Sequence, residues 1–445
     1  MANTYLTRTQ GSGNRKTFTQ SFWCKIADTS GTQSLAGAFD DGNNYSYCYL
    51  DGGNLKLQWK SGGSVIATLD TNRKFRDPNA FYNIVYAVDT TQSTASDRIK
   101  LYVNGVQETS FSTATYPSEN ASSEINGNGI TYNIGSASSG QNFNGLMSYV
   151  AFVDGTQELP TIFGETDSTT GEWKIKTSIT PSVAWGNNGF LILKNGNSLT
   201  DESSNSNNFT LGGGTLTKTE DNPSNNFCNI NTLYNQTTGQ GVVVNNCGNT
   251  VYYASNSSRS CFGSIAPSSG KYYFEAKVFG GTGTVVIGIV NMAWSNLNGA
   301  SGYAFHDDAL NFGYNVSGQK TSGGTNTAYG SAIADNDIVG VAMDLDNSKL
   351  YFSLNGVFQG SGVPTSGASG TYAAFTLASG ANYTAACRLR NGTQVGFNFG
   401  NGQYSGSNVV TTNSGDGYSG TDGASKFTYQ PPTGYSAINT KGLNL

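Results

Sequence analysis

Apolar and polar residues alternate along many short stretches of this chain, and one pair of stretches occurs twice. Residues 84–106 and 338–357 each hold an apolar run that ends in Ala-x-Asp, a polar turn, and a second run that opens Lys-Leu-Tyr. Each second run ends in Asn-Gly, at 104–105 and at 355–356. Both residues of such a pair tolerate the positive φ of a type I′ turn. The pattern predicts two β-hairpins of related design.

The same alternation predicts a series of strands in the first half of the chain. It places Ile99, Leu101 and Val103 on one face, as expected for a half-buried strand. Turns rich in Gly, Asn and Asp separate the runs. Residues 155–183 are expected to be a loop with a short helical turn. The expected strands are 18–27, 45–50, 55–60, 65–69, 81–89, 99–103, 132–135, 146–153 and 185–193.

The second half shows the same kind of pattern, after a connector at 195–240 that is rich in Asn, Ser, Thr and Gly. Apolar residues within the connector imply that it docks on the surface rather than moving freely. No long stretch shows the 3.6-residue apolar spacing of a helix. The expected strands are 272–279, 285–290, 309–314, 338–344, 349–354, 373–377, 385–389 and 395–399.

These elements predict an all-β protein of two antiparallel β-sandwich (jelly-roll) domains. The expected boundaries are 1–215 for the first sandwich, 216–240 for the connector and 241–445 for the second sandwich. The second sandwich is expected to end in an extended polar tail from Pro431 onward.

Composition supports this fold class and argues against several functions. Charged residues are 12%, aromatic residues are 12% and Gly is 58 of 445, which favours short strands and tight turns over disorder. The net charge is −5, from 24 basic and 29 acidic residues without a basic block, so no nucleic-acid partner is expected. Neither an 18-residue apolar run nor an apolar signal segment occurs, so membrane insertion and export are not expected.

The cysteines show no CxxC pair. We expect them to be small buried thiols of a protein made in a reducing cytoplasm. Bridges between Cys24 and Cys48 or between Cys247 and Cys261 stay open as alternatives. The six cysteines are Cys24, Cys48, Cys228, Cys247, Cys261 and Cys387.

Several ordered segments of the chain resemble known families. The second half resembles a SPRY domain, through residues 269–278, 287–289, 337–344, 350–356 and 395–400. The first half resembles the laminin-G-like branch of the concanavalin-A-like lectin/glucanase superfamily. The residues that carry this second resemblance are 18–19, 22–23, 81–89, 100–105 and 143–152.

A narrower resemblance covers nearly the whole chain. Residues 75–78, 89–98, 163–167, 221–227 and 431–440 are similar, in that order, to segments of large virion proteins of marine bacteriophages. This resemblance implies a non-enzymatic structural component of a phage particle, such as a fibre, spike or capsid appendage. It also implies assembly in the host cytoplasm, other virion proteins as partners and a homo-oligomeric state.

Binding loops on these sandwiches would meet a host-surface polysaccharide through exposed aromatic residues beside polar side chains. In the second domain Trp294 follows a strand and precedes a Gly-rich loop, with Tyr303, His306 and Asp307 close in sequence. Trp59 and Tyr45 are the corresponding expectation for the first domain. The alternative is that these aromatics pack under loops or in a subunit interface.

Residues for catalysis or metal binding are not evident. Glycoside hydrolysis needs two carboxylates roughly 5–10 Å apart, and the nearest grouping, Glu165, Asp167 and Glu172, lies in the expected loop. A single histidine argues against a multi-His zinc site, and no nucleophile elbow occurs. The Asp-rich turns at 40–43 and 344–347 lack the closing Glu of a twelve-residue calcium loop. We expect no metal or cofactor.

Two rival functions remain. One is a carbohydrate-active hydrolase on the lectin/glucanase fold, which the missing carboxylate pair disfavours. The other is a peptide-binding SPRY adaptor, which the low charge and the absence of a signalling domain disfavour.

Overall fold

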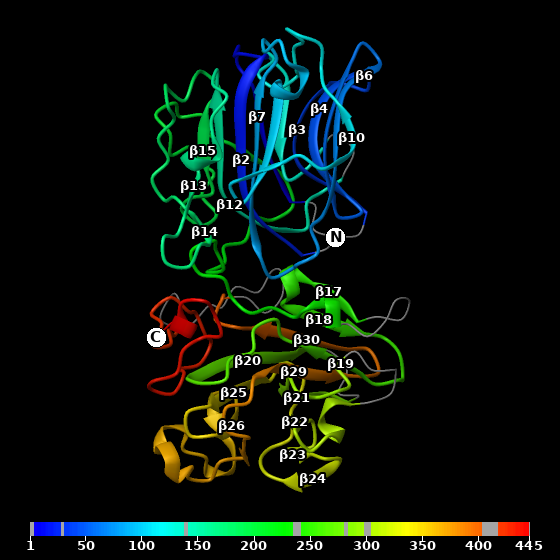
Figure 1. The fold of residues 1–445 in the computed structure, drawn as a ribbon. Helices are drawn as coiled ribbons and strands as arrows, with labels where there is room; N and C mark the ends of the chain where they lie inside the picture. The colour runs from blue at the N-terminus through cyan, green and yellow to red at the C-terminus, as the bar shows by residue number, and fades with distance from the viewer. Residues whose placement is uncertain are drawn as a thin grey trace. The chain divides into compact units, whose positions relative to one another are not determined.

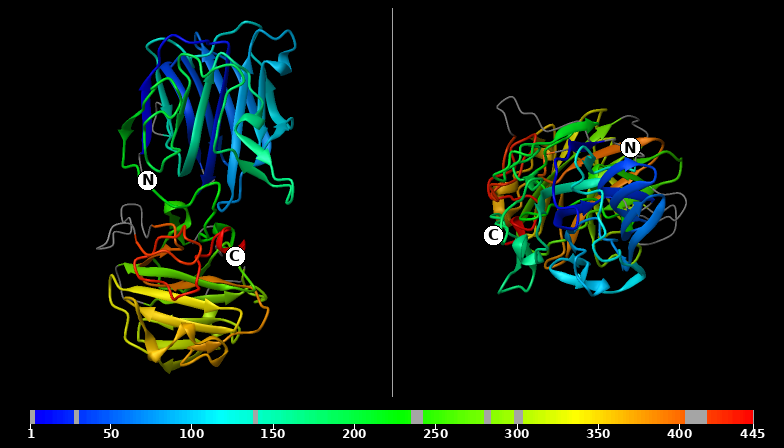
Figure 2. Two further views of the ribbon diagram at one scale, coloured as in Figure 1. Left: turned by 90° about the vertical axis from the view of Figure 1, so that its left-hand side faces the viewer. Right: turned by 90° about the horizontal axis from the view of Figure 1, so that it is seen from above.

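The computed structural model describes residues 4–27, 31–137, 141–234, 242–279, 284–297, 304–402 and 417–444. The chain divides into two compact units, residues 1–218 and residues 219–445. Figures 1 and 2 show that each unit is built mainly of antiparallel strands in packed sheets. The prediction of an all-β protein with two β-sandwiches is confirmed.

In the first unit an eight-stranded sheet packs on a six-stranded sheet. The orders are β10-β6-β5-β4-β3-β11-β1-β16 and β15-β12-β2-β7-β8-β9. Apolar side chains from both sheets fill the space between them, among them Phe18, Phe22 and Leu57. The strands are β1 (Tyr5–Thr9), β2 (Thr17–Ile26), β3 (Thr32–Asp41), β4 (Asn44–Asp51), β5 (Asn54–Ser61), β6 (Ser64–Lys74), β7 (Phe81–Asp89), β8 (Ile99–Val103), β9 (Val106–Glu108), β10 (Phe111–Thr115), β11 (Thr131–Ile134), β12 (Gly145–Asp154), β15 (Phe190–Ile192) and β16 (Thr210–Gly213).

The second unit has the same two-sheet plan. One sheet has the order β17-β18-β30-β20-β25-β26-β27, with β28 also paired to β26, and the other has the order β19-β29-β21-β22-β23-β24. The strands are β17 (Val243–Asn245), β18 (Thr250–Tyr253), β19 (Arg259–Phe262), β20 (Lys271–Phe279), β21 (Val286–Asn291), β22 (Phe312–Asn315), β23 (Gln319–Ser322), β24 (Thr325–Ala328), β25 (Ile338–Asp344), β26 (Lys349–Leu354), β27 (Val357–Phe358), β28 (Phe375–Thr376), β29 (Tyr383–Leu389) and β30 (Thr393–Asn398).

Both predicted hairpins are present, and their turns match in detail. Asn104 and Gly105 have φ of 48° and 77°, and Asn355 and Gly356 have φ of 49° and 82°. The Oδ1 atom of each turn asparagine accepts a hydrogen bond from a backbone N–H near the start of β7 or β25, the strand before the hairpin. The donors are the backbone N–H groups of Asn83, at 2.8 Å, and Ile338, at 2.9 Å. The repeated sequence pattern therefore encodes one turn geometry used twice.

In the first unit, a third layer covers the outer face of the six-stranded sheet. Its regular parts are the 3₁₀ turn η2 (Pro160–Ile162) and the hairpin of β13 (Gly164–Thr166) and β14 (Trp173–Ile175). Phe163 and Ile179 of this segment pack on the outward side chains of the sheet. The ring of Trp173 packs closely on Gly105 in the hairpin turn. A Cβ atom at position 105 would lie only 2.5 Å from this ring. The segment expected as a loop is therefore a packed cover with one hairpin.

The second unit has a corresponding cover on the sheet that contains β20. Phe227 before the sandwich and Phe427 and Tyr435 after it pack on Tyr273 and Tyr351 of that sheet. A matching aromatic contact closes the second hairpin turn, where a Cβ on the turn glycine at 356 would meet the ring of Tyr429 at 2.5 Å. The residues expected as an extended polar tail thus bury aromatic rings.

A buried carboxylate fastens this cover to β20. Glu275 has no exposed surface. It accepts hydrogen bonds from the backbone N–H of Thr428 at 2.9 Å and of Tyr429 at 2.8 Å. Asn398 Nδ2 donates a third, at 3.3 Å. A carboxylate with several N–H donors is the strong kind of hydrogen-bonded anchor.

Three expected strands are shorter than the sequence pattern indicated: the one expected at 373–377 is reduced to β28, and turns limit the other two. The strand expected at 185–193 is reduced to β15, because Gly186 has φ of 71° and a Cβ on Gly189 would lie 2.0 Å from the Trp185 carbonyl oxygen. The strand expected at 309–314 begins only at Phe312, since Asp308 caps a turn by accepting the Leu310 N–H at 2.8 Å. Local turn geometry decides both boundaries.

Five of the six cysteines are buried, and the sixth, Cys247, is half-buried. Burial raises the pKa of Cys24 to about 12, so this thiol is unreactive. Neither of the alternative bridges forms; instead Cys261 and Cys387 lie opposite each other on β19 and β29. None of the helical turns within the described residues has the length and apolarity that a membrane crossing requires.

Candidate ligand-binding face

The eight-stranded sheet of the first unit presents a row of tyrosines on its outer side. In β4 the side chains of Ser46, Cys48 and Leu50 are buried, whereas Tyr45, Tyr47 and Tyr49 are half-buried. Side chains alternate between the two faces of a strand, so the three tyrosines share the face that points away from the core. The cover described above lies on the other sheet.

Neighbouring strands add polar groups and one aromatic ring to this surface. The strand register sets Phe39 of β3 opposite Tyr45, Gln58 of β5 opposite Tyr47 and Lys56 of β5 opposite Tyr49. We call this surface the tyrosine face and define it by Phe39, Tyr45, Tyr47, Tyr49, Lys56, Gln58, Lys60, Thr68, Asp70 and Asn133.

Contacts within the tyrosine face hold its rings in place. The rings of Tyr45 and Tyr47 stack with centroids 4.4 Å apart and an interplanar angle of 12°. The Tyr45 hydroxyl donates to Gln58 Oε1 at 3.0 Å. Tyr47 lies over Gly37, where a Cβ would come within 2.4 Å of its Cδ1 atom. Because the rings are fixed before a ligand arrives, less conformational entropy is lost on binding.

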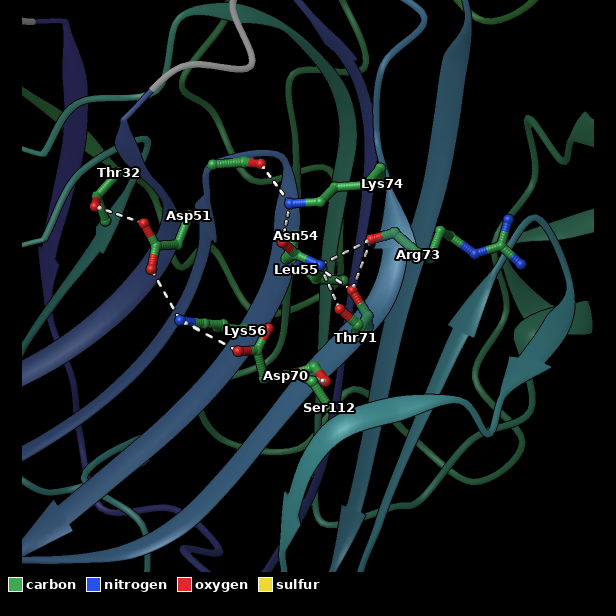
Figure 3. A network of polar contacts seen from close by, with 11 residues as sticks. Thr32, Asp51, Asn54, Leu55, Lys56, Asp70, Thr71, Arg73, Lys74 and Ser112 are labelled. Atoms are coloured by element: carbon green, nitrogen blue, oxygen red, sulfur yellow. Dashed lines mark hydrogen bonds and ion pairs between the residues drawn. The ribbon is translucent and has the colours of Figure 1, made fainter.

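A charged cluster borders the tyrosines at one end. Figure 3 shows Lys56 between two carboxylates, with its Nζ 2.8 Å from Asp51 and 3.2 Å from Asp70. The hydrogen bond from Lys56 lowers the pKa of Asp51, and the same bond raises the pKa of Lys56. Burial raises the pKa of Tyr49 despite the nearby lysine. Lys56 and Asp51 are therefore charged at neutral pH.

The two residues expected to bind in the first unit lie on opposite faces of the sheet. Tyr45 belongs to the tyrosine face. Trp59 is 2% exposed and packs in the core against Phe18, with ring centroids 6.3 Å apart. Its alternation with Lys56 and Gln58 turns it inward, so it offers no ring face to a ligand.

The expected binding residues of the second unit serve its packing. Trp294 is 7% exposed and meets Phe262 edge-on at 6.0 Å. His306 is 8% exposed in the 3₁₀ turn η5 (Phe305–Asp307). Asp307 Oδ2 accepts the Ala304 N–H at 3.1 Å and so caps that turn. Tyr303 lies outside the described residues.

The acidic groups considered for catalysis or metal binding have local roles. Asp167 accepts the backbone N–H groups of Thr169 and Thr170, which hold its pKa at about 2. Asp41 Oδ1 accepts the Asn43 N–H at 2.7 Å. Within the described parts of the chain, no three His, Cys, Asp or Glu side chains form a group that could hold a metal ion.

Tyr47 and Tyr49 were missed in the sequence, although a signal was present. Residues 45–50 read Tyr-Ser-Tyr-Cys-Tyr-Leu, so every second residue is a tyrosine. The next strand reads Leu-Lys-Leu-Gln-Trp-Lys, which puts Trp59 on the leucine face. The alternation in these two strands therefore predicts that the tyrosines lie on the outer face of the sheet and that Trp59 lies on the inner face.

Two family models match separate parts of this chain. Residues 1–162 match the model described as the concanavalin A-like lectin/glucanases superfamily, and residues 271–402 match the SPRY domain model. The tyrosine face lies within the first of these matches. No curated protein matches the chain significantly.

Three solved structures, two of them of SPRY domains, are also similar to part of the chain. The SPRY domain of human HERC1 has 15% identity and a TM-score of 0.29, covering 35% of this chain and 91% of its own. The TRIM65 PSpry domain has 12% identity and a TM-score of 0.28, and the match covers 38% of this chain and 89% of the TRIM65 chain. The stonustoxin structure has 12% identity and a TM-score of 0.29, and the match covers 38% of this chain and 27% of the stonustoxin chain. In this chain, a region similar to the concanavalin A-like lectin/glucanases superfamily is therefore followed by a region similar to the SPRY domain.

Proposed function

We propose that this chain is a non-enzymatic binding protein whose tyrosine face holds a saccharide chain. The observation that carries the proposal is the row of Tyr45, Tyr47 and Tyr49 on the outer face of β4. Sugar rings have apolar C–H faces and hydroxyl edges. Aromatic rings with polar tips can meet both, while Lys56 and Gln58 supply charged and amide partners for hydroxyl groups. The match to a lectin superfamily supports the same class of ligand.

Tyr47→Ala is expected to weaken saccharide binding by about tenfold or more, because truncating a central aromatic residue commonly removes over 1 kcal/mol. Binding to an array of bacterial polysaccharides identifies the ligand, and titration calorimetry with that ligand measures the loss. Tyr372→Ala is the matched control, since Tyr372 is 67% exposed and belongs to the second unit. Equal affinities of wild type and Tyr47→Ala would remove the tyrosine face from the proposal.

We further propose that the protein works as part of a phage particle. The ordered resemblance to virion proteins, the low share of charged residues and the two linked sandwiches support this setting. Several copies on one particle would raise a weak single-site affinity through multivalency. Mass spectrometry and cryo-electron microscopy of purified particles test this proposal. A chain that is absent from the particles contradicts it, whatever the saccharide array shows.

A hydrolase is the second candidate, because Asp51 and Asp70 both contact Lys56 beside the tyrosine face. Glycoside hydrolysis requires one carboxyl group to stay protonated as the general acid. The Lys56 hydrogen bond lowers the pKa of Asp51, which opposes that role. We therefore expect no release of reducing sugar from a bound saccharide. Release that Asp70→Asn abolishes would favour the hydrolase.

A further inference from the structure

All the arginines of the second unit lie on or just after one pair of adjacent strands. The only arginines in residues 219–445 are Arg259, Arg388 and Arg390. Arg259 opens β19, and Arg388 lies near the end of the adjacent strand β29, opposite Ser260. Arg390 follows two residues later, just after the strand. The fold thus places cationic residues from positions about 130 residues apart on neighbouring strands, in a chain that has few charges.

Hydrogen bonds to Asn256 and Ser258 hold each of these side chains in place. The Arg388 guanidinium donates to Ser258 Oγ through Nε at 3.0 Å and Nη2 at 2.6 Å. Arg259 Nη1 donates to the carbonyl oxygen of the same serine at 3.0 Å. Arg390 Nε donates to the carbonyl oxygen of Asn256. Neutral oxygens of the 256–258 loop thus orient all the guanidinium groups and leave their charge uncompensated.

No ion pair joins these arginines to a carboxylate in the described part of the chain. Asp307 acts on Arg388 only from beyond ion-pair distance. Burial and the nearby Arg390 lower the pKa of Arg388, which shows that its charge is costly in this environment. Arg259 is 2% exposed and pairs with Leu389, so its side chain lies on the opposite face of the sheet from Arg388, 5.3 Å from the centroid of the Tyr253 ring. Buried charges in proteins are ordinarily paired.

We propose that Arg388 and Arg390 form an oxyanion-binding site, here called the arginine site, which takes a sulfate or phosphate group. The planar guanidinium fork matches two oxygens of such a group, and these bonds are charge-assisted. Arg388 and Arg390 are half-exposed, so an anion can reach them from solvent. The arginine site lies in the second unit and does not depend on the tyrosine face.

The chain contains a built-in reporter of this site. His306 is the one histidine of the sequence, and it senses the charge of Arg388. An anion bound at the arginine site would therefore shift the NMR signals of a single imidazole. Potassium phosphate and potassium sulfate are titrated at pH 7 against potassium chloride of equal ionic strength. We expect a saturable shift with phosphate or sulfate and none with chloride.

Variants assign the response to the arginines. Arg388→Gln and Arg390→Gln are each expected to weaken anion binding by about tenfold, through the loss of a charge-assisted contact. Arg388→Lys, which keeps the charge, guards against a folding defect and should bind more weakly than wild type but better than Arg388→Gln. Arg76→Gln is the matched control, because Arg76 is an exposed arginine of the first unit. Asp307→Asn should strengthen binding.

The source of the anion is settled by comparing a sulfated oligosaccharide with free sulfate and free phosphate. Tighter binding of the oligosaccharide, lost in Arg390→Gln, supports a sulfated chain as the ligand. Equal binding of the free ions supports a small anion. The proposal is overturned if wild type shows no saturable response beyond the chloride control. It is also overturned if both glutamine variants respond as wild type does.

Discussion

Glu275→Ala is expected to destabilise the second unit by about 3–5 kcal/mol, as found when one partner of a buried charged contact is removed. The substitution leaves the part-buried N–H groups of Thr428 and Tyr429 without this acceptor. Calorimetric unfolding of the full chain measures the loss as a lower transition temperature. Hydrogen exchange of residues 417–444 should rise at the same time, because this segment loses its anchor.

Glu220→Ala is the matched control, since Glu220 is a half-buried glutamate of the same unit. It is expected to change stability by less than about 0.5 kcal/mol, as is usual for surface positions. Glu275→Gln keeps the shape and one acceptor oxygen, so its cost should fall between the two. A Glu275→Ala protein as stable as the control would show that the carboxylate does not anchor the cover.

Acid is expected to destabilise the second unit through His306. Burial, followed by the charge of Arg388, lowers the pKa of His306 from 6.5 to about 4, and Asp307 opposes this only in part. The unfolded state therefore binds a proton more readily than the folded state between these pH values. Stability from this group is complete above pH 6.5 and is lost as the pH falls toward 4, by up to about 3 kcal/mol.

Urea unfolding of wild type and His306→Gln at pH 7 and at pH 4.5 measures this contribution. Both proteins lose stability in acid through their carboxylates, so the informative quantity is the difference between the two losses. Wild type should lose more, by about 2 kcal/mol at pH 4.5. Equal losses would mean that the imidazole is not held neutral in the folded protein.

Sequence alternation predicted the fold well because most strands bury one face. The hairpins at Asn104 and Asn355 were predictable to the turn type, since few residues accept the backbone angles that the turn requires. Where both faces of a sheet are covered, alternation does not show which side chains face the core and which face the cover. In β25 every residue is buried, so no polar face marks its outer side. The two covers could not be foreseen, because their contacts join segments that are distant in sequence.

The candidate site was predicted only in part, for a related reason. Tyr45 lies on the outer face of β4, whereas Trp59 and Trp294, which were chosen for their residue type, are buried. A large aromatic ring is as suitable for a core as for a ligand, and only its strand face decides between them. Arg388 and Arg390 are close in sequence, but the oxygens of Ser258 and Asn256 that orient them come from a distant segment, which no local pattern reveals.

The hydrogen bonds of Glu275 can form only late in protein synthesis, because their partners lie far along the chain. Its hydrogen bonds to residues 428 and 429 span 153 and 154 positions, so β20 leaves the ribosome long before its cover is made. The first unit is complete earlier, once β16 has paired with β1. Domains commonly fold in this N-terminal-first order, and unfinished ones expose apolar surface. A ribosome that stalls before residue 417 would therefore hold a complete first unit and a second unit in which Tyr273 of β20 still lacks its cover.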